Sequence, residues 1–290
     1  MTNENKNSSP LGAGGMGGVD AHQHFWHYDP IAHEWIDETM SVIRKDFLPI
    51  DLKPLLEQHQ VDSCVAVQAD QSEKETDFLI GLAAENPFIK GVVGWVNLRA
   101  ANIRERLLHY QQYPVVKGFR HILQGEEPAF MLQPDFVRGI AALQEFDYTY
   151  DILIFPKHLN AALELVKLFP DQPFVIDHMA KPLIKAGLLD DWKKGMQALA
   201  QFPNVYCKVS GMVTEADWQN WQPDHFIPYL DTVTEAFGTS RLLYGSDWPV
   251  CLVAAHYTDM IGLVRNYFLS FSKHEQEAIF GGNAVKFYHL

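Results

Sequence analysis

The sequence has few cysteines, few cationic residues and no long apolar segment, and each shortage excludes a class of protein. Its 290 residues include three cysteines, Cys64, Cys207 and Cys251, which are too few and too scattered for a disulfide framework. They also lack the paired spacing of a structural zinc site, so a reducing cytoplasm suits them best. No apolar run approaches the ~20 residues that a membrane-spanning helix requires.

Cationic side chains are outnumbered by anionic ones, because 23 lysines and arginines stand against 36 aspartates and glutamates. The formal charge of −13 would repel phosphate backbones and anionic lipid headgroups over about a Debye length. We therefore expect neither a nucleic acid nor a membrane as partner, and a small molecule is favoured. The composition leaves the number of subunits open.

The first 18 residues are polar and then glycine-rich, without the apolar core of a secretion signal. We expect residues 1–18 to form a flexible arm and residues 19–290 to form one folded domain. A chain of 290 residues could hold two domains, but a single α/β barrel typically takes about 250 residues.

From residue 19 onward, short β-type runs alternate with amphipathic segments of helical length, which is the pattern of repeated βα units. The sequence predicts strands over 19–25, 64–69, 91–97, 115–122, 148–155, 174–178, 205–211 and 242–247. It predicts helices over 52–59, 73–86, 103–110, 135–146, 159–169, 190–202 and 226–237, with further helical segments near 257–269 and 275–280 that would close an outer ring.

The expected fold is an α/β protein with a single-domain (β/α)8 TIM barrel, because about 33 residues separate successive strands. Residues 29–46 would form a loop or short helices over one mouth of the barrel. A doubly wound open sheet is the competing architecture. Against it, no G-x-G-x-x-G turn follows the first strand.

Reacting side chains in such a barrel lie at the carboxyl ends of the strands. The first strand ends in His22 and His24, whose side chains share a face because they are two residues apart. His178 ends the sixth strand and Asp247 ends the eighth, whereas Asp177 should face the helix layer. This clustering favours one active site. Structural histidines and a turn aspartate are the competing interpretation.

Further polar side chains follow the same strand ends. Arg120, His121 and Gln124 lie on or just after the fourth strand, although simple alternation cannot turn all three inward. Lys208 lies on the seventh strand and could donate a hydrogen bond to a substrate oxygen. The competing interpretation is a lysine that reaches water from a strand end.

Aromatic rings flank the candidate catalytic residues. The indoles of Trp26 and Trp248 would suit the C–H faces of a sugar ring, but such rings also fill barrel mouths for structural reasons. Recognition of two carboxylates would favour several arginine forks, yet only Arg120 and Arg99 lie near predicted strand ends. The pattern therefore favours a neutral, polyhydroxylated substrate.

Five ordered motifs resemble the amidohydrolase superfamily. They are Val-Asp-Ala-His-Gln-His-Phe-Trp at 19–26, Gly-Phe-Arg-His-Ile-Leu-Gln at 118–124, Asp-His-Met-Ala-Lys-Pro at 177–182, Cys-Lys-Val-Ser-Gly-Met at 207–212 and Tyr-Gly-Ser-Asp-Trp-Pro-Val-Cys at 244–251. More narrowly, the chain resembles the sugar lactone hydrolases, the L-fuconolactonase and L-rhamnonolactonase group, which are related to 2-pyrone-4,6-dicarboxylate lactonase.

The resemblance implies a (β/α)8 barrel in which Asp247 is the general base and His22, His24 and His178 line the reacting centre. It implies hydrolysis of a sugar-acid lactone by an activated water. No metal would be required, or one divalent ion, most readily zinc, would bind to His22, His24 and Asp247. The fifth strand ends at Phe155 without the histidine that many metal-dependent members place there, which argues against a binuclear site.

Two other functions remain open at this point. One is a metal-dependent decarboxylase or amide hydrolase built on the same scaffold, which chelation would inactivate. The other is a sugar-binding barrel without catalysis, which the retained Asp247 and the strand-end histidines disfavour. The identity of the lactone and the size of its ring also remain open.

Overall fold

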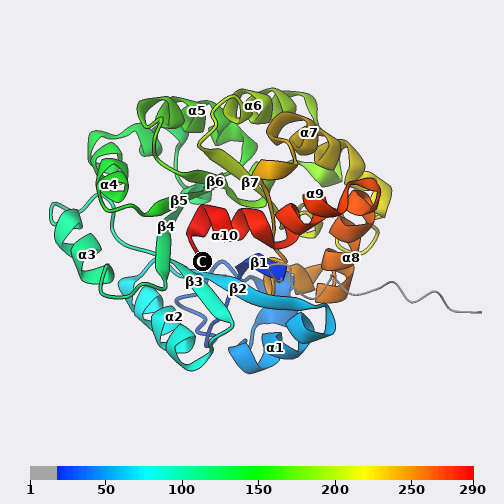
Figure 1. The fold of residues 1–290 in the computed structure, drawn as a ribbon, viewed down its shortest axis with the longest axis horizontal. Coiled ribbons are helices and arrows are strands. Elements are labelled where there is room, and N and C mark those ends of the chain that lie inside the picture. The colour runs from blue at the N-terminus through cyan, green and yellow to red at the C-terminus, as the bar shows by residue number, and fades with distance from the viewer. Residues whose placement is uncertain (1–17) are drawn as a thin grey trace, which may run out of the picture.

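Eight parallel strands form a nearly closed barrel in the computed structural model, which describes residues 18–290 (Figure 1). Each strand pairs with the next one along the chain, so the doubly wound alternative is excluded. The strands are β1 (Gly18–Gln23), β2 (Val61–Val67), β3 (Ile89–Gly94), β4 (Val116–Ile122), β5 (Thr149–Leu153), β6 (Phe174–Ile176), β7 (Val205–Val209) and β8 (Leu242–Tyr244).

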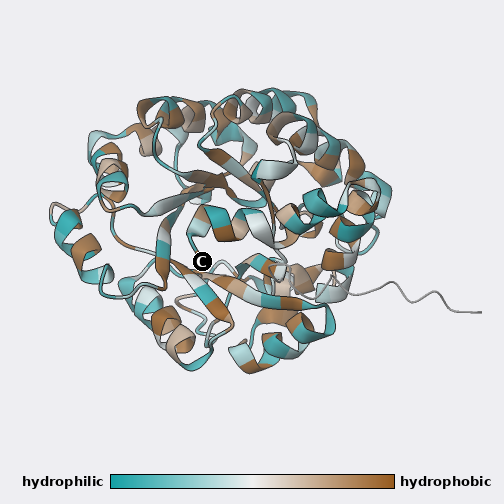
Figure 2. Ribbon diagram, viewed as in Figure 1, coloured by the Kyte–Doolittle hydropathy of each residue, from teal (hydrophilic) through white to brown (hydrophobic). Residues whose placement is uncertain are grey.

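Helices follow the strands and surround them, as the alternating pattern predicted (Figure 1). They are α1 (Pro49–Gln58), α2 (Glu73–Glu85), α3 (Ile103–Tyr110), α4 (Pro134–Glu145), α5 (Leu159–Leu168), α6 (Asp190–Ala200), α7 (Ile227–Phe237) and α8 (Tyr257–Tyr267). These helices carry both apolar and polar positions, and their apolar residues pack on the sheet (Figure 2). The predicted single barrel is therefore confirmed.

Seven of the eight strands end two or three residues before their predicted bounds, and only β4 ends where predicted. Two of these early ends involve candidate catalytic residues, because β6 stops at Ile176 and β8 stops at Tyr244. His178 and Asp247 have φ angles of 50° and 57°, in the left-handed region that L residues seldom adopt. Both candidate catalytic residues therefore lie on sharp turns just beyond the strands.

The last segment of the chain does not close the outer ring as expected. After α9 (Lys273–Glu277), a π-helical turn leads into α10 (Asn283–Tyr288), which lies across the middle of the barrel (Figure 1). The Asn283 side chain donates to the carbonyl of Leu242, at the start of β8, over 2.7 Å. Lys117, near the start of β4, donates to the carbonyl of His289 over 2.8 Å. α10 therefore covers the amino-terminal mouth.

Apolar side chains from β1, β2, β3, β6 and β8 fill the barrel between α10 and the opposite mouth. This inner cluster contains Val19, Ala21, Val65, Val67, Val93, Val175 and Leu243, closed below by Ala284, Phe287 and Tyr288. Because this apolar cluster fills the interior near the amino-terminal mouth, polar side chains converge at the carboxyl-terminal mouth.

Two expectations concern the start of the chain. The predicted flexible arm lies outside the described residues except for Gly18, which begins β1. Residues 29–46 form a loop with one 3₁₀ helix (Glu38–Ile43), as predicted. Within residues 18–290, no helix combines the length and apolar character needed to cross a membrane.

Candidate active site

Backbone hydrogen bonds close the barrel beyond the end of β8 and fix three candidate residues side by side. Asp247 N–H donates to the carbonyl of His22 over 2.8 Å, and His24 N–H donates to the carbonyl of Trp248 over 2.7 Å. The pairing of β1 with β2 also gains an extra residue between Asp20 and Gln23. Such a bulge redirects side chains, and here it turns His22 toward the interior.

Three imidazoles surround one carboxylate oxygen. Oδ1 of Asp247 lies 3.4 Å from Nε2 of His24, 3.7 Å from Nε2 of His178 and 4.0 Å from Nε2 of His22. Asp247 is 2% exposed, and His24 and His178 are 4% exposed. The structure thus brings together residues from the first, sixth and eighth βα units, at a centre that opens narrowly to solvent.

Two glycines make room for the imidazole rings. A Cβ atom on Gly211 would lie 2.5 Å from Nδ1 of His178, and the φ angle of Gly211 is 60°. A Cβ atom on Gly245 would lie 2.6 Å from Cβ of His22. Any larger residue at either position would displace a ring, so the glycines help to determine the geometry of the site.

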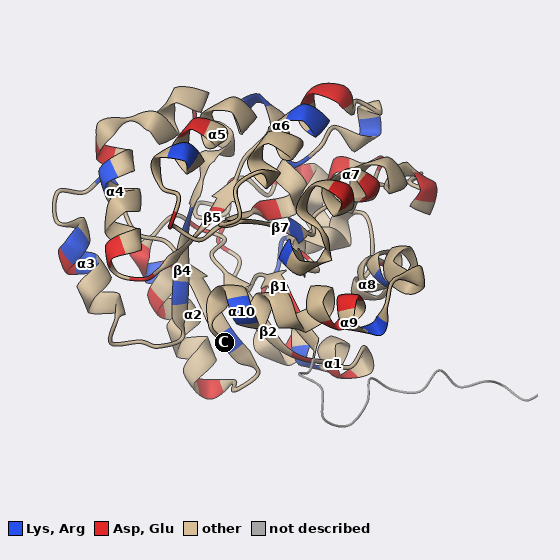
Figure 3. Cartoon of the chain, turned by 45° about the horizontal axis from the view of Figure 1, so that its top comes forward, with Lys and Arg blue, Asp and Glu red and all other residues tan. Residues whose placement is uncertain are grey.

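Four buried charges form a floor beneath the imidazoles. Nζ of Lys208 lies 2.5 Å from Oδ2 of Asp151 and 2.9 Å from Oδ1 of Asp177. Arg120 donates to Oδ2 of Asp177 over 3.0 Å, and Tyr288 from α10 donates to Oδ2 of Asp151 over 2.7 Å. Two cations therefore balance two carboxylates, as burial requires. Figure 3 shows that charged residues lie on strands inside the ring of helices as well as on the helices themselves.

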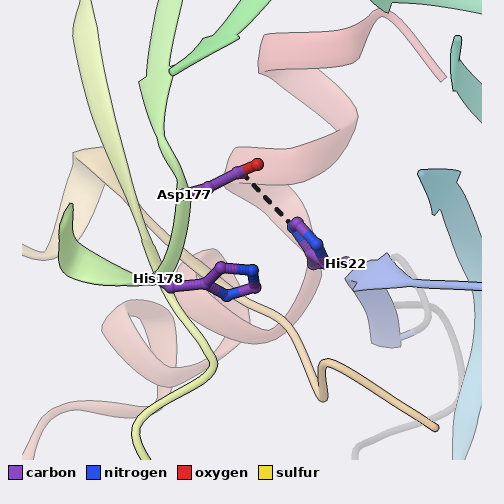
Figure 4. A group of neighbouring side chains, drawn as sticks. All are labelled: His22, Asp177 and His178. Atoms are coloured by element: carbon purple, nitrogen blue, oxygen red, sulfur yellow. Dashed lines mark ion pairs between the residues drawn. The ribbon is translucent and has the colours of Figure 1, made fainter. Parts of the chain in front are cut away.

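Asp177 faces the barrel interior, so its predicted orientation toward the helices is wrong. Its Oδ1 lies 3.3 Å from Nδ1 of His22, and Figure 4 shows Asp177 and His178 reaching inward together. Strand alternation itself gives this direction, because Asp177 lies two residues after Val175, whose side chain fills the barrel. The error came from placing His178 on the inward face of a strand, whereas β6 ends at Ile176 and a left-handed turn brings His178 to the site. Four consecutive residues, 178–181, then have positive φ angles.

Hydrogen-bond partners determine which ring nitrogens carry protons. Nδ1 of His24 lies 2.7 Å from the carbonyl oxygen of Val67, which can only accept, so that nitrogen carries the proton. Cationic donors face both ring nitrogens of His22, because a guanidinium nitrogen of Arg120 lies 3.3 Å from Nε2 and Nζ of Lys208 lies 3.1 Å from Nδ1. The partners therefore fix the proton of His24 alone.

The proton on Nδ1 of His24 leaves its Nε2 lone pair directed at the Asp247 carboxylate. Nε2 of His22 and Nε2 of His24 are 3.2 Å apart, and both face Oδ1 of Asp247. Lone pairs that face each other repel unless a cation or the hydrogens of a water molecule lie between them. The site is therefore suited to hold a water or a metal ion.

Burial and neighbouring charges set the protonation of the site. Burial lowers the pKa of His22 well below 6.5, with the Lys208 charge adding to the effect. Burial also lowers the pKa of His178 well below 6.5, against the opposing charge of Asp247. Burial alone would raise the pKa of Asp247, but His178 and His24 outweigh it, so that pKa lies below 3.8. At neutral pH the site therefore combines the neutral rings of His22 and His178 with the Asp247 carboxylate.

The donor atoms fit one metal ion better than two. His22, His24 and Asp247 offer ligand atoms that are 3.2 to 4.0 Å apart, close to the ~3.3 Å that separates ligands of one tetrahedral zinc. A second group, of His22, Asp177 and His178, shares His22 with the first. Among the described residues these two groups overlap, which agrees with the prediction of at most a single ion.

The structure places two predicted substrate-binding residues in the charged floor. Lys208 is fully buried, so the interpretation of a lysine reaching water is wrong. Arg120 is 3% exposed and bonds Asp177 and the carbonyl of Gln68. Both cations are therefore occupied by protein partners beneath the imidazoles.

The other predicted substrate-binding residues make their contacts outside the cluster of imidazoles, although the Trp26 ring centroid lies 6.4 Å from that of His24. His121 stacks on Phe130, and Gln124 lies in a separate 3₁₀ turn (Leu123–Gly125). Trp26 donates to the carbonyl of Lys45, and both Trp26 and Trp248 are at most 2% exposed. Their burial in the aromatic core does not support the expected stacking on a sugar ring.

Sequence reasoning missed three residues of this region. Asp151 and Tyr288 complete the charged floor, and Lys181 lies at the end of the left-handed turn after β6. An aspartate inside an otherwise apolar strand was the available signal for Asp151, because a buried charge needs a partner. No pattern in the sequence marked Tyr288, which reaches the floor only because α10 closes the barrel.

Comparisons with known proteins agree with this geometry. The amidohydrolase family model matches residues 19–290. The chain is 39% identical over 284 residues to L-fucono-1,5-lactonase of Burkholderia multivorans, covering 94% of this chain and 96% of the relative. It is 36% identical over 281 residues to L-fucono-1,5-lactonase of Burkholderia ambifaria, covering 94% and 95%.

A solved amidohydrolase structure from Burkholderia multivorans, with bound zinc, shares 39% identity and superposes with a TM-score of 0.91. That superposition covers 94% of this chain and 99% of the relative. The barrel, the convergent histidines and the family match therefore lead to one conclusion: this chain belongs to the amidohydrolase family.

Proposed function

We propose that this protein hydrolyses a sugar-acid lactone, with Asp247 as the general base. The observation that carries the proposal is the convergence of His22, His24 and His178 within 4.0 Å of one Asp247 oxygen. The two relatives named L-fucono-1,5-lactonase supply the class of substrate, and L-fucono-1,5-lactone is the first compound to test.

The proposed reaction begins with a water held between His22, His24 and Asp247. The Asp247 carboxylate removes a proton from this water, and the hydroxide attacks the lactone carbonyl. Assistance by such a base is typically worth about 10²–10⁴-fold in rate. The low pKa of Asp247 keeps it ionised and ready to accept the proton across the neutral range.

Charge then builds on the carbonyl oxygen. His178 is the suitable donor, because Ser210 lies 2.8 Å from its Nδ1 and can donate there, leaving the ring proton on Nε2. One well-placed donor to such an oxyanion is worth roughly 3–4 kcal/mol. Ring opening releases an alkoxide, which takes back the proton held by Asp247.

A divalent ion, zinc in the first place, would bind to His22, His24 and Asp247. When bound, it would lower the pKa of water and polarise the carbonyl. The proposed steps do not require it, because the carboxylate, the imidazoles and the charged floor already orient the water and the substrate. The metal-dependent decarboxylase or amide hydrolase remains the second candidate, favoured by the same three ligands.

The direct test is a screen of aldonolactones with a pH indicator, run with and without a chelator. We expect hydrolysis of at least one sugar lactone with kcat/KM above about 10⁴ M⁻¹s⁻¹, which is the lower end of the usual enzyme range. We expect at least half of that activity to survive chelation.

Two outcomes would contradict this proposal. Absence of hydrolysis across the panel would favour a sugar-binding barrel, which a binding measurement would then detect. Complete loss of lactone hydrolysis on chelation, with recovery of activity on addition of zinc, would favour the metal-dependent alternative.

We also propose carbohydrate metabolism in the cytoplasm as the setting, with a small lactone as the partner. The three cysteines are free and buried, and the net charge of −13 disfavours nucleic acids and anionic lipids.

A further inference from the structure

An ion pair occupies the space between the buried floor and the rim of the active-site mouth. Nζ of Lys181 lies 3.0 Å from Oε1 of Glu215. Lys181 follows His178 by three residues, at the end of the left-handed turn after β6. Glu215 belongs to a 3₁₀ turn (Val213–Glu215) after β7, so two neighbouring strand ends supply the pair.

The burial of this pair distinguishes it from the other ion pairs. The Lys208 pairs in the floor are 0% exposed, and the surface pair of Lys167 with Glu164 is 48% and 56% exposed. Lys181 and Glu215 are 17% and 16% exposed. The pair is thus partly desolvated, which strengthens its hydrogen bonds, yet solvent still reaches it.

Lys181 is electrostatically coupled to the reacting centre. Its charge lowers the pKa of both His178 and Asp247, although burial is the largest influence on each. Its ammonium also lies 5.9 Å from the ring centroid of Phe155, which follows β5 and is only partly buried. A polar pair and a partly exposed aromatic ring therefore lie together on the side of the mouth formed by β5, β6 and β7.

We propose that Lys181 and Glu215, with Phe155 beside them, bind the ring hydroxyls of the substrate and select a hydroxylated lactone over a plain one. This inference rests on the proposed lactone hydrolysis. A neutral pair does not attract an anion, but it offers three N–H donors beside a carboxylate acceptor. A hydroxyl group both donates and accepts, so two adjacent hydroxyls can satisfy both partners.

Phe155 completes the match with a sugar ring. An aromatic face packs on the C–H groups of a sugar while polar neighbours bind its hydroxyls. The tryptophans that the sequence suggested for this role are buried, whereas Phe155 is partly exposed. Specificity for hydroxyls follows, because a substrate that lacks them would exclude water from the remaining N–H groups of Lys181 and lone pairs of Glu215 without replacing those hydrogen bonds.

Steady-state kinetics of Lys181→Gln and Glu215→Gln test the proposal. For L-fucono-1,5-lactone we expect KM to rise about 10- to 100-fold, because each variant loses a hydrogen bond to a charged group. We expect kcat to stay within about threefold of the wild-type value. The second probe is δ-valerolactone, a six-membered lactone without hydroxyls, measured as a competitor so that it need not be hydrolysed. Its inhibition constant should stay within about twofold, because it makes no hydroxyl contacts.

Matched variants separate this role from a structural one. Lys167→Gln removes a charge from an exposed pair. It should change neither KM for L-fucono-1,5-lactone nor the inhibition constant of δ-valerolactone. The double variant of Lys181 and Glu215 leaves no unpaired charge, so it provides the measurement if a single variant fails to fold.

An unchanged KM for the sugar lactone in the Lys181 and Glu215 variants would overturn the proposal. A fall in kcat without a rise in KM would overturn it as well. A rise in the δ-valerolactone inhibition constant parallel to that in KM would also overturn it, because the pair would then act on the shape of the whole mouth. If the wild-type protein does not hydrolyse the sugar lactone, the proposed function itself fails, and that result appears before any variant is compared.

Discussion

The position of one ring proton decides what the active site can bind. Val67 fixes the proton of His24 on Nδ1. The Nε2 atom of His24 therefore presents a lone pair toward the Asp247 carboxylate. A site of this kind orients the hydrogens of a water molecule, which is what a hydrolytic reaction needs.

The position of His178 depends on a residue that has no functional group. Gly211→Ala would place a Cβ atom 2.5 Å from the imidazole and force the ring away from Asp247. We expect kcat to fall at least about tenfold, since small displacements of a reacting group are costly. Steady-state kinetics measures the change in kcat, and urea unfolding measures the change in the free energy of unfolding.

Gly187→Ala is the matched control for this prediction. Gly187 has a similar φ angle of 64°, in the left-handed region, but its Cβ atom would meet nothing within 4 Å. Both variants should lose about 1–2 kcal/mol of unfolding free energy from backbone strain, and only Gly211→Ala should lose activity. Equal activity in the two variants would show that the ring does not need this space.

At the residue scale, some side-chain directions could be predicted from the sequence and others could not. The shared face of His22 and His24 was predictable, because both lie on or next to one strand. The directions of Asp177 and His178 were not, because His178 reaches the site through a left-handed turn of four L residues, a conformation that usually calls for glycine. Alternation counted from His178 therefore gave the wrong face for Asp177, whereas alternation counted from Val175 gives the right one.

Among the elements, α10 connects the closed end of the barrel to the active site. Tyr288 on this helix donates to Asp151, which holds Lys208 beneath His22. Tyr288→Phe keeps the ring and removes the donor, so we expect a loss of about 2 kcal/mol of unfolding free energy, as for hydrogen bonds to buried charges. Urea denaturation measures this loss.

Tyr267→Phe is the matched control, because Tyr267 donates to the exposed Asp231 over 2.6 Å. Water replaces that bond, so the loss should stay below about 1 kcal/mol. Equal losses in the two variants would mean that the Asp151 network does not stabilise the barrel.

The regular elements were largely predictable, and their long-range placement was not. The helix at 103–110 agrees with α3, since its apolar positions follow the helical period. The segment after α9 is helical too, but its amphipathic pattern fits the outer ring and the barrel mouth equally well. Contacts with Leu242 and Lys117, distant in sequence, decide between the two places.

At the scale of the whole molecule, the barrel converts distant residues into one site. The motifs predicted this convergence, because the carboxyl ends of all barrel strands meet at one mouth. They did not predict the charge balance beneath it, since Asp151, Lys208 and Tyr288 come from separate strands and from a helix at the opposite mouth. Fold and site are thus stabilised by the same buried network.

The central claim is that the Asp247 carboxylate removes the proton from the attacking water. The measurement that tests it most directly is kcat of Asp247→Asn on the lactone that the wild-type protein hydrolyses best. The control is Asp191→Asn, which changes an exposed aspartate on α6 and should leave kcat unchanged. We predict that Asp247→Asn folds normally and loses about 10²–10⁴-fold in kcat; a folded variant with near-normal turnover would contradict the account.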